Sequence, residues 1–331
     1  MTLDEKIGQM TQIERGWLRG PDDVATFLLG SVLSGGGSAP ATNTPQGWAD
    51  MVDGFQEAAL STRLGIPILY GTDAVHGHGN LLNATIFPHN IGIGAARDPA
   101  LAQAIGRATA EEVAASGANW TFGPCVCVAR DERWGRTYES YSEDPGLVAS
   151  MTTVITGYQG ESLGSAPASI LATAKHFLGD GGTESGVDQG DVRMPEADLE
   201  RLFLPPYQAA VKAGVGSVMV SFSSVNGLTM HADAHLITDV LKGQLGFTGF
   251  VVSDFAGINR IDGDSRTRSA TDVTTAINAG IDMVMVPSDP GTFEEILRAE
   301  AQNGDIPQAG STTPSPASSP SSSASGSSSA R

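Results

Sequence analysis

The chain has 331 residues, of which 40% are hydrophobic and 6% aromatic, and its formal net charge is −18 at pH 7. This length is enough for one large core, or for a large domain and a small one. Such an acidic surface repels phosphates, which argues against nucleic acids and anionic membranes as partners and suits neutral or cationic ligands. Since no stretch reaches the roughly 18 apolar residues of a spanning helix, the sequence predicts no membrane span.

The N-terminal stretch MTLDEKIGQMTQIERGW (1–17) has the pattern of an amphipathic helix, with Thr2 and Glu5 as a capping box. After it, short apolar runs recur, each followed by polar residues. Near-continuous apolar runs of this length are typical of parallel strands that are covered on both faces. The runs lie at 30–36, 66–73, 91–98, 118–125, 169–177, 216–224, 249–255 and 281–289.

Helical patterns separate these runs. One begins with Asp98 as a cap and Pro99 in the first turn. Another, near the end of the chain, opens with Thr292 and Glu295 as a capping box. The apolar stripe of the first is Leu101, Ile105 and Ala108, and that of the helix predicted over 234–246 is Leu236, Ile237, Val240 and Leu241.

Eight strands that alternate with helices predict an α/β fold of the (β/α)8 TIM-barrel type, as a single domain over 1–309. A doubly wound open sheet is the alternative, but its glycine-rich phosphate loop is missing. From Gly310 the sequence is rich in Ser, Pro and Ala and has no Leu, Ile, Val or aromatic residue. A segment of this composition cannot bury enough apolar surface to fold, so 310–331 is predicted to be a disordered tail.

The two cysteines, Cys125 and Cys127, lie two residues apart in a predicted strand. Residues at this spacing in a strand point the same way but are too far apart for an unstrained disulfide. They are also too few for a zinc site. We therefore expect two small, buried thiols.

Charged residues follow several of the predicted strands. In a barrel the active site lies at the carboxyl ends of the strands, so these side chains should converge on one rim and hold a polar ligand. The residues are Asp73, Arg130, Asp131, Arg136, Glu139, Lys175, His176 and Asp254.

Three chemistries fit such a rim. The first is glycoside hydrolysis, with Asp254 as the nucleophile and a second carboxyl group as the acid. The second is metal-dependent hydrolysis of the amidohydrolase type, with His76 and His78 joining His176 and Asp254 as ligands. The third is Schiff-base chemistry at Lys175, as in aldolases.

Seven segments resemble, in the same order, the motifs of glycoside hydrolase family 3, the β-glucosidases and exo-β-glucanases. The resemblance spans roughly 1–309 and implies a (β/α)8-like first domain and a retaining mechanism that needs no metal or other cofactor. It implies removal of β-D-glucosyl residues from the non-reducing ends of β-glucosides or β-glucans. The segments are MTLDEKIGQM, GIPILYGTDAVHG, TIFPHNIGIGAARDPAL, RDERWGRTYESYSEDP, ATAKHFLGDGGT, LPPYQAAVKAGVGSVMVSFSSVNG and QLGFTGFVVSDFAGI.

The resemblance assigns roles to particular residues. It places the nucleophile at Asp254, where a buried run ends on a carboxylate. The substrate-binding candidates are Asp73, Arg136, Lys175 and His176, together with Phe222, Phe255 and Arg260. Because no His lies between His176 and His231, the sequence does not resemble the N-acetylglucosaminidase branch, which has its acid/base there.

Departures from the family pattern concern aromatic residues. Phe255 stands where the family usually has Trp, Phe222 where it has Tyr, and Val225 where Trp is common. Each change removes a hydrogen-bonding or stacking group near the sugar, so substrate preference is expected to differ.

In the glucosidase branch, a second α/β domain downstream of the barrel supplies the general acid. Here NGDIPQA (303–309) is followed directly by the Ser/Pro/Ala-rich stretch, and we expect a truncated form that lacks this acid. Glu139, Asp180 and Glu184 are the carboxylates near the rim that could replace it. An inactive, sugar-binding remnant is the alternative.

Overall fold

The computed structural model describes residues 1–307. The predicted tail at 310–331, and the last two residues of the predicted domain, lie outside this described part. None of the helices within residues 1–307 has the length and apolar character needed to cross a membrane. The strands are β1 (Thr11–Glu14), β2 (Ser31–Ser34), β3 (Leu69–Thr72), β4 (Trp120–Thr121), β5 (Thr173–Phe177), β6 (Asp191–Val192), β7 (Ser217–Val220), β8 (Ser224–Val225), β9 (Leu228–Thr229), β10 (Phe250–Val252) and β11 (Val284–Val286).

Two sheets of parallel strands make up the centre of the molecule. One has the order β11-β1-β2-β3-β4 and the other the order β10-β7-β5. Single bridges join their edges, from Trp120 to Leu171 and from Val252 to Met283. The small strands β6, β8 and β9 form a third sheet. The predicted α/β class with parallel strands is therefore confirmed.

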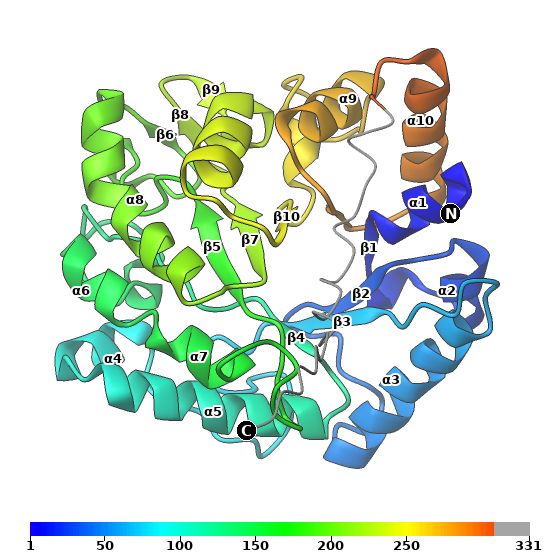
Figure 1. Cartoon of the computed structure of the whole chain (residues 1–331), viewed down its shortest axis with the longest axis horizontal. Helices are drawn as coiled ribbons and strands as arrows, with labels where there is room; N and C mark the ends of the chain where they lie inside the picture. Colours follow the sequence, from blue (N-terminus) through cyan, green and yellow to red (C-terminus); the bar gives the residue numbers. More distant parts are fainter. Residues whose placement is uncertain (308–331) are drawn as a thin grey trace, which may run out of the picture.

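The helices lie around the outside of the strands (Figure 1). Each covers the apolar side chains of the strands it connects, which is why strand and helix alternate along most of the chain. The α-helices are α1 (Leu3–Gln9), α2 (Asp22–Thr26), α3 (Pro45–Leu60), α4 (Asn90–Ala96), α5 (Pro99–Ala115), α6 (Pro145–Ser150), α7 (Thr153–Gln159), α8 (Glu196–Lys212), α9 (Ala270–Ala279) and α10 (Pro290–Asn303). The shorter or wider helices are η1 (Arg15–Trp17), η2 (Thr137–Glu139), η3 (Glu184–Gly186), η4 (Met230–Ala232), η5 (His235–Gln244) and η6 (Gly257–Arg260).

Two predicted elements differ from the structure. The run at 91–98, predicted as a strand, is helix α4, in which Asn90, Ile93 and Gly94 are buried at helical spacing. Conversely, residues 11–14, predicted as part of the first helix, form strand β1. Its buried Gln12 donates to the Ser31 hydroxyl (Nε2 to Oγ, 2.8 Å). Because this polar residue interrupts the apolar run, the sequence pattern did not predict a strand here.

The predicted helix ends are largely confirmed. Thr2 and Glu5 form the capping box of α1, and Asp98 accepts hydrogen bonds from the first turn of α5. The capping box predicted at Thr292 is wrong, because α10 begins earlier. Asp289 is its cap and accepts from both the backbone and the hydroxyl of Thr292.

The predicted buried stripes are confirmed for η5, where Leu236, Ile237, Val240 and Leu241 are all buried. In α5 the stripe is wrong at Leu101, which is 43% exposed. Its small residues face the core instead, because Gly106 lies against the backbone of Val154 and Gly157 in α7. The predicted stripe was based on the large apolar residues, whereas the close contact between α5 and α7 requires the smallest ones.

The parallel arrangement brings the carboxyl ends of the strands to one rim. Strand β1 ends at Glu14, β3 is followed by Asp73, and β10 is followed two residues later by Asp254. Inside, Gly71 on β3 faces the Phe122 ring so closely that a methyl group there would overlap it. The backbone of β3 and this aromatic ring therefore fix the inner surface below the rim.

Helix α10 buries a carboxyl group that is not compensated. Glu294 is 8% exposed, and its Oε1 has no hydrogen-bond partner within the described residues. Burial raises the pKa of Glu294 from its usual 4.5 to about 8, against the opposing effect of Arg298. The protonated form therefore stabilises the fold fully below about pH 4.5, and this contribution is lost as the pH rises towards 8.

We predict that Glu294→Gln removes this loss of stability. One pKa unit corresponds to about 1.4 kcal/mol, and we expect the free energy of unfolding of the variant to exceed that of the wild type by about 1–3 kcal/mol at pH 8.5. Urea unfolding at pH 5 and pH 8.5 measures this. Glu295→Gln, on the exposed face of the same helix, is the control. A Glu294→Gln difference that is the same at both pH values would contradict the prediction.

Candidate active site

Most of the predicted site residues line one cavity of about 460 Å³. It opens at the carboxyl ends of the parallel strands, where the sequence predicted that charged side chains converge. The predicted residues that line it are Asp73, Arg136, Lys175, His176, Phe222, Asp254 and Phe255. Arg260 does not line the cavity but stacks on a residue that does.

Asp254 lies just beyond β10 and is 9% exposed. Its Oδ1 accepts from the backbone N–H of Phe255 at 2.7 Å, and its own N–H donates to His231 Nε2 at 3.1 Å. Burial raises the pKa of the Asp254 carboxyl above its usual value, while the charges of His176, Lys175 and Arg136 and the Phe255 hydrogen bond oppose the rise. Hydrogen bonds to its backbone N–H and to its Oδ1 thus hold Asp254 in place, and His176, Lys175 and Arg136 face its carboxyl group.

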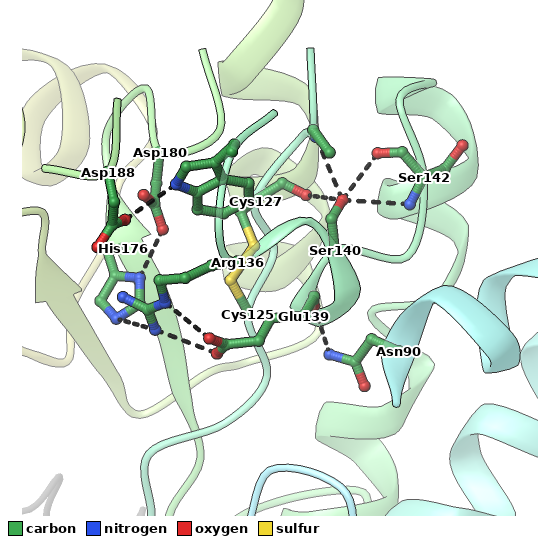
Figure 2. The surroundings of a disulfide bond; sticks show 12 residues. Asn90, Cys125, Cys127, Arg136, Glu139, Ser140, Ser142, His176, Asp180 and Asp188 are labelled. Atoms are coloured by element: carbon green, nitrogen blue, oxygen red, sulfur yellow. Dashed lines mark hydrogen bonds and ion pairs between the residues drawn. A yellow bond between two sulfur atoms is a disulfide. The ribbon is translucent and has the colours of Figure 1, made fainter. Parts of the chain in front are cut away.

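His176 lies between the nucleophile candidate and a second carboxylate. Its Nδ1 bonds Asp180 Oδ2 at 2.7 Å (Figure 2), and its Nε2 lies 3.7 Å from Asp254 Oδ2. Asp180, as a carboxylate, can only accept, so Nδ1 carries a proton. In the neutral ring Nε2 then accepts from the Arg136 guanidinium at 3.4 Å. Asp180 therefore sets the direction in which His176 faces the cavity.

Arg136 comes from the loop after β4 and pairs with Glu139 through two hydrogen bonds of 2.6 and 3.1 Å (Figure 2). Burial opposes its charge, but the contact with Glu139 outweighs this and raises the pKa of Arg136. Burial likewise raises the pKa of Glu139, and its hydrogen bonds with Arg136 reverse the shift to a net lowering. Both groups are thus charged, and the pair presents a fixed hydrogen-bond donor to the cavity.

Lys175 and Asp73 form the other ionic pair at the cavity, with Nζ 3.6 Å from Oδ1. The Lys175 side chain is buried whereas that of Asp73 is 42% exposed. Lys175 therefore serves as a buried cation and hydrogen-bond donor, while Asp73 offers oxygens to a ligand. Such alternating donors and acceptors suit the hydroxyl groups of a sugar.

Aromatic residues form the edge of the cavity. Phe255 is 41% exposed and lies in the cavity lining, so part of its ring is accessible to a ligand. The Arg260 guanidinium lies over the Phe222 ring, 4.4 Å from its centroid, and donates to Gln189 Oε1 at 2.7 Å. Arg260 thereby links the turn after Asp254 to the loop after β5.

The cysteine prediction is wrong in one respect. Cys125 and Cys127 are buried as expected, but they form a disulfide with their Cα atoms 5.3 Å apart (Figure 2). The prediction assumed a regular strand, whereas only Cys125 makes a bridge, to Lys175, and the chain leaves the strand conformation after it. The cysteines pack with Trp134 and lie beside the Arg136 loop and the Lys175–His176 segment.

The metal hypothesis loses its ligand set, because neither predicted loop histidine reaches the cavity. His78 is fully buried and bonds the Ser116 hydroxyl, while His76 bonds the Phe87 carbonyl and stacks on His89. In residues 1–307, the group of His, Cys, Asp and Glu side chains close enough to share an ion is Cys125, Cys127 and Asp180. Its sulfur atoms are bonded to each other, so this group offers no thiolate.

The carboxylates suggested as replacement acids do not line the cavity either. Glu139 is paired with Arg136, and Asp180 accepts from His176. Glu184 is largely exposed and lies 3.5 Å from Arg193. All three therefore have local partners that account for their positions.

The sequence analysis did not identify two residues that the structure brings to the site. Glu14, at the end of β1, lines the cavity and accepts from the Ser38 hydroxyl and the Gly16 N–H. Since β1 was predicted as helix, its strand-end carboxylate was not considered. His231 contacts the backbone of Asp254 from 23 residues away, and no local pattern marks that contact.

Comparison with known proteins agrees with this geometry. The model of the glycosyl hydrolase family 3 N-terminal domain matches residues 2–312. A lysosomal β-glucosidase of Dictyostelium discoideum is 33% identical over 93% of this chain and 41% of its own length. A periplasmic β-glucosidase of Salmonella typhimurium is 36% identical over 86% of this chain and 36% of its own.

Solved structures give the same result. A mutant form of the exo-1,3/1,4-β-glucanase of a Pseudoalteromonas species superposes with a TM-score of 0.89 at 45% identity, over 94% of this chain and 51% of that one. A β-glucosidase of Listeria innocua, in complex with isofagomine, superposes with a TM-score of 0.81 at 30% identity, over 94% and 43%.

The matches define a class of carbohydrate-active enzymes. The chain belongs to glycosyl hydrolase family 3, and the resemblance stated from its motifs is confirmed. It spans less than half the length of the curated relatives given above.

We predict that the two cysteines of the chain resist alkylation when the protein is denatured without a reductant. After treatment with a dithiol reductant, the chain should gain two alkyl groups, which intact-mass spectrometry measures. The reason is that the two sulfur atoms are already bonded to each other.

A Cys125→Ala/Cys127→Ala double variant is the control, since it should gain no alkyl group in either state. Alkylation of the unreduced wild-type protein at both positions would show that the thiols are free and would contradict the prediction.

Proposed function

We propose that this chain carries the nucleophile and the sugar pocket of a retaining β-glycosidase, which removes β-D-glucosyl residues from the non-reducing ends of β-glucosides or β-glucans. The observation that carries the proposal is Asp254, a buried carboxylate at a strand end that faces His176, Lys175 and Arg136. The names of the relatives, β-glucosidases and an exo-1,3/1,4-β-glucanase, support the substrate class.

In the first step, an Asp254 oxygen attacks the anomeric carbon of the sugar. The bond from that carbon to the leaving oxygen breaks, and the leaving group departs with the electron pair and receives a proton from a general acid. In the second step, water attacks the same carbon while the conjugate base of the general acid takes one of its protons. The bond from that carbon to the Asp254 oxygen breaks, and the carboxylate and the general acid are regenerated. Because Oδ1 is held by the Phe255 N–H, Oδ2 is the oxygen that attacks.

The surrounding residues have defined roles in this proposal. Lys175 and Arg136 donate hydrogen bonds to sugar hydroxyls, Asp73 accepts from them, and His176 presents its Nε2 to the same ligand. Phe222 and Phe255 line the entrance, where they contact the sugar or the leaving group, and Arg260 acts from behind Phe222 by holding that ring in place. Phe255 and Phe222 bind through apolar faces alone, since neither has the polar group of the Trp and Tyr that the family pattern contains.

The described carboxylates that line the cavity are Glu14, Asp73 and Asp254. Asp73 pairs with Lys175, and Glu14 accepts from Ser38 and Gly16. Neither is thus free to act as the acid, and we infer that the acid comes from a second α/β domain of the family.

A (β/α)8-type barrel is part of the same proposal. The eight strands would be β1, β2, β3, β4, β5, β7, β10 and β11, and the single bridges at Trp120–Leu171 and Val252–Met283 support closure at both gaps. This barrel would occupy residues 1–309, followed by a low-complexity tail.

We predict that an activated 2-deoxy-2-fluoro-β-glucoside labels the chain once, at Asp254. The fluorine slows both steps, and a good leaving group restores the first, so the glycosyl ester accumulates. Intact-mass spectrometry followed by peptide mapping measures this.

Asp254→Asn should give no label and lower turnover by at least about 10³-fold. Asp53→Asn, an exposed carboxylate on α3 away from the cavity, is the matched comparison and should still be labelled. If folded wild-type protein binds glucose-type inhibitors but is not labelled, the chain is a sugar-binding protein and the proposed activity is wrong.

We also predict a strong dependence on the leaving group. A dinitrophenyl β-glucoside should react at least about 10²-fold faster than a methyl β-glucoside, because an acidic phenol departs without the protonation that a general acid provides. Steady-state rates of the 331-residue chain on the two substrates measure this. Similar rates on both would mean that the chain contains its own acid.

A further inference from the structure

A buried imidazole lies directly behind the proposed nucleophile. His231, on η4, has no exposed surface, and its Nε2 accepts the hydrogen bond from the backbone N–H of Asp254 at 3.1 Å. An Nε2 that accepts must be unprotonated, so the proton of the neutral ring is on Nδ1. Within the described residues, Nδ1 has no hydrogen-bond partner.

The ring also contacts the turn that follows Asp254. Gly257 lies so close to His231 that any Cβ at this position would overlap the imidazole. The Gly257 N–H donates to the Asp254 carbonyl at 2.9 Å. His231 therefore contacts the first and last residues of the turn 254–257, and Phe222, whose ring centroid is 6.1 Å away, lies on its other side.

Its surroundings keep this ring neutral. Burial lowers the pKa of His231 to about 3, and the positive charges of Arg260 and His176 act in the same direction. A neutral ring remains an acceptor at Nε2 throughout the pH range in which Asp254 is ionised. His231 does not line the cavity, so it reaches the substrate only through Asp254.

We propose that His231 is a positioning residue for the reaction, which fixes the backbone of Asp254 and the turn 254–257 and thereby sets the approach of the carboxylate to the anomeric carbon. This inference rests on the proposed function. It assigns His231 an effect on the rate of ester formation rather than on sugar binding, because the polar groups that bind the sugar, Asp73, Arg136 and Lys175, lie on other segments of the chain.

The chain offers well-matched variants for a test. In His231→Gln, Oε1 is separated from Cβ by the same number of bonds as Nε2 and can accept from the Asp254 N–H. In His231→Asn the acceptor is one bond too short, and His231→Leu has no acceptor. His78, the other fully buried histidine behind the rim, does not contact Asp254, so His78→Leu controls for the general cost of altering a buried histidine.

The experiment measures two quantities on each folded variant, with folding checked by circular dichroism. The first is the labelling of Asp254 by the activated 2-fluoroglucoside, resolved into rate constant and binding constant. The second is hydrogen exchange of the backbone amides at 250–260, measured by mass spectrometry. We expect His231→Leu and His231→Asn to lower the labelling rate constant by about 10²-fold, the cost of a misplacement of about 1 Å.

The binding constant should change by less than about threefold in these variants, since the polar sugar-binding groups Asp73, Arg136 and Lys175 lie outside the turn 254–257. Exchange at Asp254 should become at least about tenfold faster, because its N–H loses its acceptor. His231→Gln should stay within about fivefold of the wild type in rate, and His78→Leu should leave both quantities unchanged even if it lowers the melting temperature.

The outcomes separate this inference from the proposed function. Labelling of His231→Leu and His231→Asn at the wild-type rate would overturn the role of His231, as would equal losses in His231→Gln and His78→Leu. If wild-type protein is not labelled at all, the proposed function fails. Faster exchange at Asp254 in the His231 variants alone would then show that the backbone contact exists without a catalytic role. If His231→Leu does not fold, the labelling rates of His231→Gln and His231→Asn decide whether the acceptor at this position matters.

Discussion

The balance of charge around Asp254 is the constraint on which the rest of the site depends. Burial disfavours the ionised carboxyl, and His176, Lys175 and Arg136 oppose that effect. These groups are themselves largely buried and have partners, Asp180 for His176, Asp73 for Lys175 and Glu139 for Arg136. Removing one member leaves its partner without its ion pair or hydrogen bond, so the members of this network stabilise one another.

The network also explains why the cavity lies where it does. Its members come from the loops after β3 and β4, from β5 and from the end of β10, which are distant in sequence. Parallel strands bring these segments to one rim, and a backbone bridge from Cys125 to Lys175 joins the segment before the Arg136 loop to β5. The Lys175 N–H donates to the Pro124 carbonyl, and the Val126 N–H donates to the Lys175 carbonyl. Backbone contacts, rather than side-chain contacts alone, therefore hold the charged groups in register.

The sequence predicted those parts of the fold and the site that depend on contacts between residues close together in the chain. Apolar runs that end in a charged residue correctly predicted β3 before Asp73 and β10 before Asp254, because strand, burial and rim are one continuous stretch. Strand β1 was missed because Gln12 interrupts the apolar pattern. The run at 91–98 was taken for a strand because it is short and apolar. In the structure it is helix α4, whose Gly94 lies against the backbone of Tyr141.

The contacts that complete the site are not local, and the sequence alone could not supply them. Arg136 was expected at the rim because it follows the fourth predicted strand, but its pairing with Glu139 was not predicted. The pairing of His176 with Asp180 and the contact of His231 with Asp254 depend on loop conformations. The hydrophobic periodicity that predicts helices and strands gives no information on them. The disulfide was excluded by assuming an ideal strand, and a short departure from that conformation is enough to form it.

The contact between Gly71 and Phe122 has a consequence for changing the pocket by laboratory evolution. Any side chain at Gly71 would overlap the ring of Phe122, which lines the cavity, so the cavity wall would have to shift. The backbone of Gly71 therefore limits the pocket on this side. Since every other residue is larger than glycine, no single replacement at this position enlarges the pocket. New substrate preferences are accessible mainly from the mouth, where Phe222 and Phe255 have room to vary. Selection for bulkier aglycones should accordingly accumulate changes at the entrance and leave the inner surface intact.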